Sequence, residues 1–269
     1  MIDLSIVIVN YNAKSCLKSC LLSIYQTINS INYEVFVIDN NSSEKIEEMM
    51  RSEFPKAKVI FNDTNEGFSK ANNKAIKECS GRYIFLLNND TVLMADAVKS
   101  LYSFMDRSPE TGIAGPQILT DQETLQESFF KIPNLFTEFM QKNFYNKIVE
   151  NKESLLGKRQ YLKYQKEQEV DWITGACMMI RKEAIEDAGL FDEKYFMYFE
   201  DADLCCRVRK EGWKVKYFPG AKIIHQGGVS KRSNETVVAK EYRASQLYFY
   251  KKHNSRFSFY LLKIYLLFK

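Results

Sequence analysis

The sequence predicts an α/β fold in which a mostly parallel sheet carries helices on both faces and is followed by C-terminal helices. Short apolar runs alternate with longer amphipathic stretches four times before residue 107, which is the pattern of consecutive βα units. Three of these runs, 6–9, 35–38 and 85–87, stop directly at Asn or Asp residues. Because open α/β sheets present ligands along one edge, we expect the active site where these three strands end.

The predicted elements follow one another regularly in the first part of the chain, where each strand leads into a helix. The pairs are strand 4–9 with helix 13–28, strand 34–38 with helix 43–53, strand 58–61 with helix 68–79, and strand 83–87 with helix 95–107. Between about 120 and 168 the pattern dissolves into aromatic, Lys-rich and Gln-rich sequence without a clear period. We interpret this stretch as an insertion or a mobile region over the sheet edge. Strand-like sequence resumes at 170–172, and the elements expected after it are strand 175–180, helix 200–211, strands 214–218 and 222–225, and helix 235–252.

The chain is long enough for one large domain with an appendage. It has 269 residues, of which 45% are hydrophobic, enough to bury a sizeable core. We divide it into a domain over 1–230, with halves at 1–115 and 116–230, and a C-terminal helical tail over 231–269. Six cysteines without a CxxC pair, and no secretory signal, indicate a reduced, cytoplasmic setting.

Charge is distributed unevenly, although the net charge is only +4. Lysines and arginines stand among Phe and Leu in the tail, whereas Glu200, Asp201 and Asp203 form an acidic cluster inside the chain. This distribution argues against a nucleic-acid partner. No run reaches the ~20 apolar residues that span a bilayer. An amphipathic helix from Arg256 to Lys269 would either lie on the inner face of the cytoplasmic membrane or dock onto the core.

The usual phosphate-binding loops are absent from the sequence. It contains no GxxxxGK[ST] motif, and no GxGxxG follows the first strand, so kinase, ATPase and dinucleotide-binding functions lose their support. At the end of the fourth strand, Asn88, Asn89 and Asp90 offer instead the amides and the carboxylate that suit an oxygen-liganded divalent cation bridging a diphosphate. The alternative is that this segment is only a turn.

The acidic cluster follows four large apolar residues at 196–199. Helix capping accounts for one or two of its carboxylates, and crowding against apolar groups raises the proton affinity of the others toward that of a general base. Of the two histidines, His225 follows an apolar strand and is either structural or a metal ligand. His253 stands in a Lys-rich stretch that we expect to be exposed, without a functional cluster around it.

Six short segments form an ordered set of motifs along the chain. They are SIVIVNYN at 5–12, VIDNNS at 37–42, NEGFSKANN at 65–73, LLNND at 86–90, TGA at 174–176 and FEDAD at 199–203. Together they resemble family 2 glycosyltransferases, and within that family the bacterial rhamnosyltransferase-like group. The resemblance covers about residues 3–230 and implies a GT-A fold, a Rossmann-like nucleotide-binding arrangement. The 1–115 half would bind the nucleotide-sugar donor and the 116–230 half the acceptor.

On the donor side, the resemblance implies roles for five residues. Asp39 would hydrogen-bond the pyrimidine base of the nucleotide, and Tyr11 would pack near that base. Gly67 and Asn72 would line the nucleotide and phosphate side, where glycine permits close backbone approach. Asn89 would also contact the nucleotide-sugar.

The resemblance also implies a metal site. Asp90 corresponds to the last carboxylate of the family's Asp-x-Asp motif, and because asparagines precede it here, Asp90 alone supplies the charge. In the family a histidine about two dozen residues after the base completes the site, and His225 stands 24 residues after Asp201. Imidazole beside carboxylate suits Mn²⁺, and Mg²⁺ is the alternative through diphosphate oxygens and water.

On the acceptor side, Trp172, Gly175 and Glu200 would border the acceptor sugar, although Trp172 is equally compatible with a core position. Asp201 matches the general base of the family, with Glu200 and Asp203 in support. We therefore expect a metal-dependent sugar transfer with inversion, in which Asp201 removes the proton from the acceptor hydroxyl.

The expected donor is dTDP-L-rhamnose or a UDP-sugar, and the expected acceptor is a cell-envelope glycan or a lipid-linked saccharide. A nucleotidyltransferase shares acidic metal chemistry at strand ends, but it normally needs a basic, Gly-rich phosphate loop, which residues 9–13 do not provide. A catalytically inactive binding module is the third hypothesis. The presence of both Asp90 and Asp201 argues against it.

Overall fold

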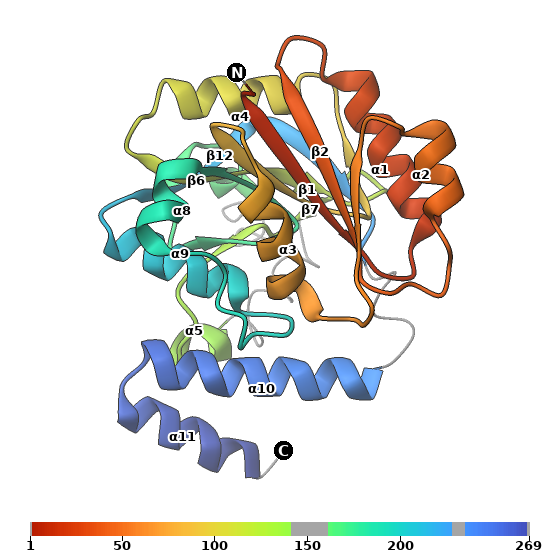
Figure 1. Ribbon diagram of the computed structural model, residues 1–269. Helices are drawn as coiled ribbons and strands as arrows, with labels where there is room; N and C mark the ends of the chain where they lie inside the picture. Colours follow the sequence, from red (N-terminus) through yellow and green to blue (C-terminus); the bar gives the residue numbers. More distant parts are fainter. Residues whose placement is uncertain (1, 141–160, 228–234, 268–269) are drawn as a thin grey trace.

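The computed structural model describes residues 2–140, 161–227 and 235–267, and a mixed sheet forms its centre (Figure 1). The main path of this sheet has the order β3-β2-β1-β4-β11-β6-β12-β5. In chain order these strands are β1 (Leu4–Asn10), β2 (Tyr33–Asp39), β3 (Lys58–Phe61), β4 (Tyr83–Asn88), β5 (Thr91–Leu93), β6 (Thr111–Leu119), β11 (Cys177–Arg181) and β12 (Lys214–His225).

The half of the sheet formed by β1 to β4 is parallel, as the sequence predicts. β1 lies between β2 and β4, with Leu4, Ile6 and Ile8 packed on one face and Val7 on the other. This near-continuous apolar pattern is typical of a strand that helices cover on both sides. The helices of the first face are α1 (Lys14–Thr27), α2 (Glu47–Glu53) and α4 (Ala97–Asp106), and those of the second are α3 (Gly67–Glu78), α8 (Lys182–Ala188) and α9 (Glu200–Lys210).

The other half of the sheet is mixed. β11 pairs antiparallel with both β4 and β6, whereas β12 pairs parallel with β6 and antiparallel with β5. The predicted strands 214–218 and 222–225 are one strand, β12, with a register irregularity between Phe218 and Lys222. Pro219 and Gly220 stand in this interval. Both residue types disturb ladder pairing, which is why the sequence suggests two strands.

Strand β6 was not predicted, because Gly112, Gly115 and Pro116 belong to residue types that weaken strands. The structure shows why glycine stands there. A Cβ at Gly112 would lie 2.8 Å from Trp213, and one at Gly115 would lie 2.4 Å from Ile173. Close packing around β6 therefore requires residues that argue against a strand when the sequence is considered alone.

The stretch 120–168 contains elements that were also not predicted. They are β7 (Leu125–Gln126) paired with β6, β8 (Phe129–Phe130) paired with β10 (Trp172–Ile173), α5 (Leu135–Met140), and β9 (Gln168–Glu169) paired with β12. Each is too short for a hydrophobic period to be recognised. Residues 141–160, which belong to the same predicted insertion, lie outside the described residues.

Helices α10 (Glu235–His253) and α11 (Arg256–Leu267) lie together at one end of the molecule, at the bottom of Figure 1. The prediction of a helix over 235–252 is confirmed. A cluster of buried side chains joins these helices to the residues around α9, and it includes Tyr195, Ala202, Cys206, Phe249, Tyr250 and Leu262. None of the described helices combines the length and the apolar character that a membrane crossing requires.

Candidate active site

The ends of β1, β2 and β4 bring three polar side chains together at one edge of the sheet. The parallel register pairs Asn10 with Asp39. Asn10 Nδ2 donates a hydrogen bond to Asp39 Oδ1 at 2.8 Å, and Asn89 Nδ2 donates to Asn10 Oδ1 at 2.9 Å. Asn10 therefore links Asp39 to the segment that follows β4.

The Asp39 carboxylate is buried and held by the loop that follows β2. Its Oδ1 accepts a hydrogen bond from Ser42 Oγ at 2.7 Å, and its Oδ2 accepts one from Ser42 N at 3.0 Å. With the bond from Asn10, these contacts occupy three of the roughly four acceptor positions of a carboxylate. One position on Oδ2 is left for a donor such as an N–H group of a base. Tyr11 follows Asn10 at this edge and is 38% exposed.

Gly67 packs against a segment that is distant in the sequence. Its φ is +81°, and a Cβ there would lie 2.4 Å from the Phe196 carbonyl oxygen. Phe68 N donates to the same oxygen at 2.7 Å. Glycine is therefore required by the contact between α3 and the segment before α9. The place of Gly67 on the nucleotide and phosphate side, which the family resemblance implies, stays a prediction.

Asn72 is buried in α3, where its Nδ2 donates to the Phe68 carbonyl at 2.9 Å. Its predicted contact with the donor stays a prediction. The adjacent Asn73, which was not singled out from the sequence, binds the Phe191 main chain in both directions, at 2.9 and 3.0 Å. Nothing in the sequence alone distinguishes the roles of these two neighbouring asparagines.

Asp90 and His225 meet in the structure, as predicted. His225 Nε2 lies 3.1 Å from Asp90 Oδ1, and both side chains are largely buried. The antiparallel pairing of β5 with β12 places His225 opposite Thr91, which explains the contact. One carboxylate and one imidazole suit Mn²⁺ or Mg²⁺. Among the described residues no three or more His, Cys, Asp or Glu side chains are arranged so that they could hold a metal ion together, so a cation here would take its other ligands from substrate and water.

Gln126 of β7 is a neighbour of His225 that was not predicted. Its amide group lies 3.0 to 3.2 Å from His225 Nδ1. A cation bound at Nε2 requires the proton to be on Nδ1, where Gln126 Oε1 can accept it and orient the ring. Asn88 Nδ2 lies 3.3 Å from Nε2. Because Gln126 belongs to the stretch without a period, no signal in the sequence marks it.

Asp201 stands in the first turn of α9, against the turn that precedes β11. Its Oδ2 accepts a hydrogen bond from Gly175 N at 2.9 Å. A Cβ on Gly175 would lie 3.6 Å from both the Asp201 Cβ and the Phe68 ring. Asn88 N donates to the Ala176 carbonyl at 2.9 Å. The turn therefore joins Asp201 to the end of β4, beside the segment that carries Asp90.

Glu200 and Asp201 form a pair of carboxyl groups with raised proton affinity. Burial raises the pKa of Glu200 well above its ordinary value, and the negative charge of Asp201 adds to the effect. Glu200 Oε2 is buried without a hydrogen-bond partner in the described part of the chain. Burial also raises the pKa of Asp201, and the N–H groups of Gly175 and Ala202 oppose this only in part. Such groups titrate as a pair, and a raised pKa suits a general base.

Asp203 does not share this environment, and its proton affinity is lowered rather than raised. Burial alone would raise the pKa of Asp203, but hydrogen bonds from His253 and Lys252 and the charge of Arg207 hold it well below its usual range. The side chain of His253 is buried, with Nε2 2.6 Å from Asp203 Oδ1. The expectation that His253 is exposed and has no functional groups around it is therefore wrong.

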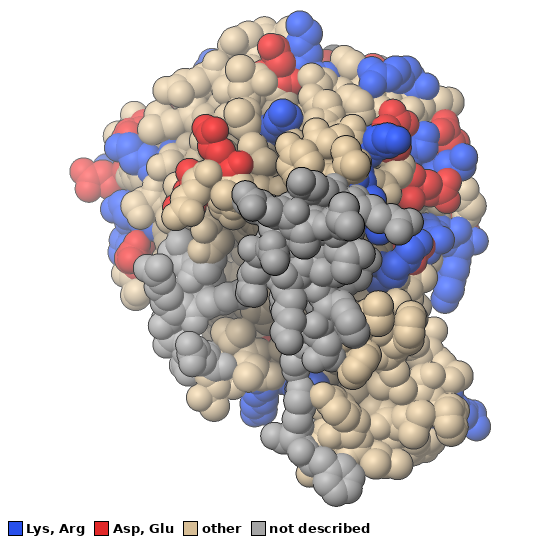
Figure 2. All heavy atoms as spheres, turned by 180° about the vertical axis from the view of Figure 1, so that it is seen from behind, with Lys and Arg blue, Asp and Glu red and all other residues tan. Residues whose placement is uncertain are grey.

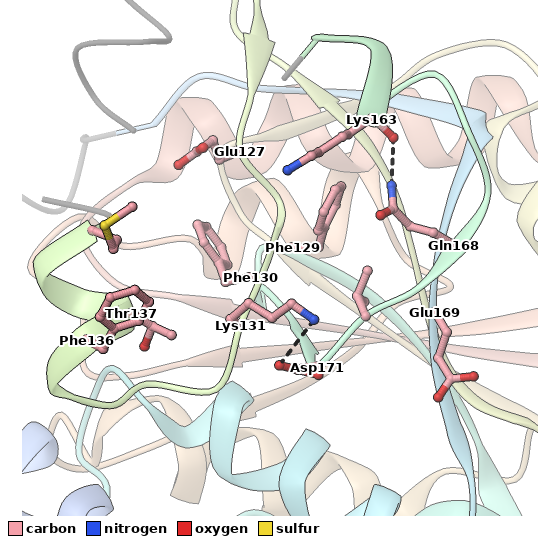
Figure 3. A pocket seen from close by; sticks show the side chains of 12 residues that line it. Glu127, Phe129, Phe130, Lys131, Phe136, Thr137, Lys163, Gln168, Glu169 and Asp171 are labelled. Carbon is pink, nitrogen blue, oxygen red and sulfur yellow. Dashed lines mark hydrogen bonds and ion pairs between the residues drawn. The ribbon is translucent and has the colours of Figure 1, made fainter. Parts of the chain in front are cut away.

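Trp172 of β10 packs on Phe130, which lines a cavity of about 330 Å³ (Figure 3). Its ring stacks on Phe130 with 4.5 Å between the centroids, and its Nε1 donates to the Lys131 carbonyl at 2.9 Å. Phe130 and Lys131 line the cavity, and Lys131 Nζ lies 3.7 Å from the Asp171 carboxylate. Aromatic rings beside charged groups suit a sugar-containing ligand.

Known proteins match the chain over most of its length. The model of a family described as glycosyl transferase family 2 matches residues 5–189. An N-acetylglucosaminyl-diphospho-decaprenol L-rhamnosyltransferase of Mycobacterium tuberculosis is 25% identical over 232 residues, which are 82% of this chain and 75% of the relative. The low-salt glycan biosynthesis hexosyltransferase Agl10 of Haloferax volcanii is 28% identical over 245 residues, which are 87% of this chain and 70% of the relative.

A solved structure shares the fold. The crystal structure of GalNAc-T7 with UDP, GalNAc and Mn²⁺ matches with a TM-score of 0.66 at 16% sequence identity. The match covers 93% of this chain and 50% of that one, so the chain corresponds to half of the larger protein. At this identity the likeness concerns the fold alone, and it confirms the predicted α/β architecture of GT-A type.

Proposed function

The chain belongs to glycosyl transferase family 2, and we propose that it moves a sugar, with inversion, from a nucleoside-diphosphate donor to a hydroxyl of a cell-envelope glycan or lipid-linked saccharide. The observation that carries the proposal is the turn at Gly175. Asp201 accepts a hydrogen bond from Gly175 N, and the carbonyl of Ala176 accepts one from the N of Asn88, which stands two residues before Asp90. A carboxyl group with a raised pKa and a cation-binding pair thus adjoin the same turn.

A single displacement accounts for the roles of these groups. Asp201 takes the proton of the acceptor hydroxyl while the hydroxyl oxygen bonds to the anomeric carbon of the donor sugar. The bond from that carbon to the diphosphate oxygen breaks in the same step. Asp90 and His225 hold the divalent cation, Mn²⁺ or Mg²⁺. When bound, such a cation supplies Lewis-acid stabilisation of the departing diphosphate. No covalent intermediate is required.

The donor is held by the edge that β1, β2 and β4 form. Asp39 offers its remaining acceptor position to the base, Tyr11 packs beside the base, and Gly67, Asn72 and Asn89 line the phosphate and sugar side. We infer dTDP-L-rhamnose or a UDP-sugar as the donor. The name of the Mycobacterium tuberculosis relative supports rhamnose, and that of the Haloferax volcanii relative supports a hexose.

The acceptor enters from the side of β10. Trp172, Gly175 and Glu200 border the acceptor sugar, and the cavity beside Trp172 takes further parts of the saccharide. The Mycobacterium tuberculosis relative is named for a diphospho-decaprenol substrate, which supports a lipid-linked acceptor for this chain.

A donor panel tests the function. With dTDP-L-rhamnose and UDP-hexoses offered in turn, together with Mn²⁺ and a lipid-linked N-acetylglucosaminyl diphosphate, we expect one donor to release a nucleoside diphosphate and one equivalent of glycosylated lipid. Phosphatase-coupled detection and mass spectrometry measure the two products. Release of a sugar 1-phosphate would instead indicate a nucleotidyltransferase, because transfer of the nucleoside monophosphate from such a donor leaves the sugar 1-phosphate. Tight donor binding without release from any donor would indicate an inactive binding module.

We also propose that α11 rests on an anionic membrane surface. Its outward face carries large apolar side chains at helical spacing, with exposed fractions from 39% for Leu261 to 82% for Leu267. The helix has two basic residues, Arg256 and Lys263, and no acidic one. In Figure 2 the end of the molecule that α10 and α11 form, at the lower right, is mostly tan with scattered blue. The exposed apolar residues are Phe257, Tyr260, Leu261, Ile264, Tyr265 and Leu267.

Vesicle binding tests this surface. The protein should sediment with phosphatidylglycerol vesicles, and about 1 M salt should weaken binding because it shortens the Debye length to about 3 Å. A Tyr260→Glu, Ile264→Glu variant should lose binding, whereas Leu22→Glu, which changes a comparably exposed leucine on α1, should not. Unchanged vesicle binding by the double variant would refute the proposal. The proposal would also be refuted if the unmodified protein formed a dimer and the double variant were a monomer, because the face would then bind a second copy of the chain.

A further inference from the structure

The Asp203 carboxylate joins the first turn of α9 to the C-terminal end of α10. It is completely buried. Lys252 Nζ and His253 Nε2 lie 2.7 and 2.6 Å from Oδ1, and Arg207 Nε lies 2.8 Å from Oδ2. A buried carboxylate is costly when it lacks partners. Here two of the side chains that compensate the charge, Lys252 and His253, come from α10.

The same helix holds the segment that leads into α9. Lys252 Nζ and Tyr248 OH both donate to Asp192 Oδ2, at 2.7 and 2.9 Å. Ser245 Oγ donates to the Met197 carbonyl at 2.7 Å. Successive turns of α10 therefore fix both ends of the segment, and Lys252 connects this set of contacts to Asp203.

The backbone just before α9 is strained. Tyr198 and Phe199 have φ values of +70° and +65°, which bulky side chains rarely adopt. The ring of Tyr242 of α10 packs 5.5 Å from that of Tyr198 and 5.3 Å from that of Phe199, and Phe249 packs 5.5 Å from Phe199. Such a conformation persists only when surrounding contacts hold it, and α10 provides these contacts.

We propose that Asp203 is a positioning residue: held by Lys252 and His253, it fixes the first turn of α9 and with it the direction of Asp201. The inference rests on the proposed function, in which Asp201 is the general base. It makes the C-terminal helices a part of the catalytic unit, because the residues that secure Asp203 come from the end of α10.

The geometry explains why this contact affects catalysis as well as stability. Asp201 and Asp203 belong to the same helical turn, and Asp201 Oδ2 depends on a 2.9 Å contact with Gly175 N. A rotation of the turn would move the Asp201 carboxylate relative to the acceptor hydroxyl. Displacements of about 1 Å in an active site can cost about 10²-fold in rate.

Two adjacent lysines provide the test. Lys252→Met removes one charge from Asp203 but keeps the length of the side chain, and we expect kcat to fall by about 10- to 100-fold with a nearly unchanged KM for the donor. Lys252→Arg should restore most of kcat. Lys251→Met, which changes the exposed neighbour of Lys252, is the matched control and should leave kcat unchanged.

The pH profile separates positioning from a purely structural role. With one charge removed from its partners, the negative charge of Asp203 is compensated less completely, and this charge raises the pKa of Glu200, which titrates together with Asp201. The acid limb of kcat should therefore move to higher pH. Tyr195, Tyr248 and Cys206, on which the charge of Asp203 also acts, have raised pKa values and stay neutral. A purely structural role would lower the melting temperature and the number of nucleotide-binding sites but leave kcat per site unchanged.

His253→Gln gives a second measurement, since glutamine keeps a donor for Asp203 without the possibility of a charge. Both variants are compared per nucleotide-binding site, counted by calorimetry with the nucleoside diphosphate. A kcat per site equal to that of the unmodified protein in both Lys252→Met and His253→Gln would overturn the inference. Absence of transfer by the unmodified protein would count against the proposed function instead.

Discussion

Asp201→Asn is expected to lower kcat by about 10²- to 10⁴-fold, which is the range that a positioned general base contributes. Asparagine keeps the size of the side chain and an oxygen that can accept the Gly175 N–H group, but it cannot take a proton. Because the base acts in the transition state, the Kd of the nucleoside diphosphate with metal, measured by calorimetry, should change by no more than about threefold.

Glu200→Gln is the comparison that assigns the base. Glu200 adjoins Asp201 and also has a raised pKa, so it is the rival for the role, and we expect its loss to be milder. Normal turnover by Asp201→Asn together with loss in Glu200→Gln would transfer the assignment to Glu200. Activity in both variants would leave these carboxylates as helix-capping groups.

The same pair determines the pH dependence. A base works in its ionised form, so kcat rises with pH through the apparent pKa of the pair. Because burial raises the pKa of both groups, this limb should lie above the ordinary range of an aspartate. Burial and the charge of Asp201 raise the pKa of Glu200 well above its ordinary value, so Glu200 still holds its proton while Asp201 ionises. Glu200→Gln should therefore leave this limb nearly in place. A clear shift of the limb to lower pH would show instead that Glu200 is ionised beside Asp201.

Much of the fold could be predicted because local pattern and global structure agree. β1 to β4 are mostly apolar runs, and their parallel register follows from the helices between them. The contact between Asn10 and Asp39 is a direct consequence of that register. Asp90 and His225 were also placed together correctly, but only through the spacing of motifs in a resembling family, since nothing local relates β5 to the end of β12.

The unpredicted parts depend on contacts between distant segments. β6 contains glycines because a side chain at those positions would collide with Trp213 or Ile173. The acidic cluster appears uniform in the sequence, yet the long-range approach of α10 makes Asp203 a paired group with a lowered pKa, while no Lys, Arg or His of the described residues pairs with Glu200 or Asp201. The sequence of the cluster alone does not show which of its three carboxylates will contact basic side chains of a helix about 50 residues later.

Asp90→Ala is expected to lower turnover by about 10²- to 10³-fold, since a bound cation contributes several kcal/mol of transition-state stabilisation. Asp90 is the only carboxylate of its segment, and His225 Nε2 lies 3.1 Å from it, so its removal leaves one protein ligand. His225→Ala should need more Mn²⁺ to reach half activity. Gln126→Leu should show a smaller change in the same direction, because partners of a ligating histidine typically contribute 10- to 100-fold in affinity.

Binding of the cation can be measured without turnover. Electron paramagnetic resonance counts free Mn²⁺ in the presence of the nucleoside diphosphate, and we expect Asp90→Ala to bind less Mn²⁺ than the unmodified protein at every concentration. Lys251→Met should bind the same amount, because Lys251 is exposed on α10 and outside the site. If Asp90→Ala kept full activity in a chelator and bound Mn²⁺ normally, the cation would be held elsewhere or not used. Asp90 and His225 would then be a buried ion pair that only joins β12 to the end of β4.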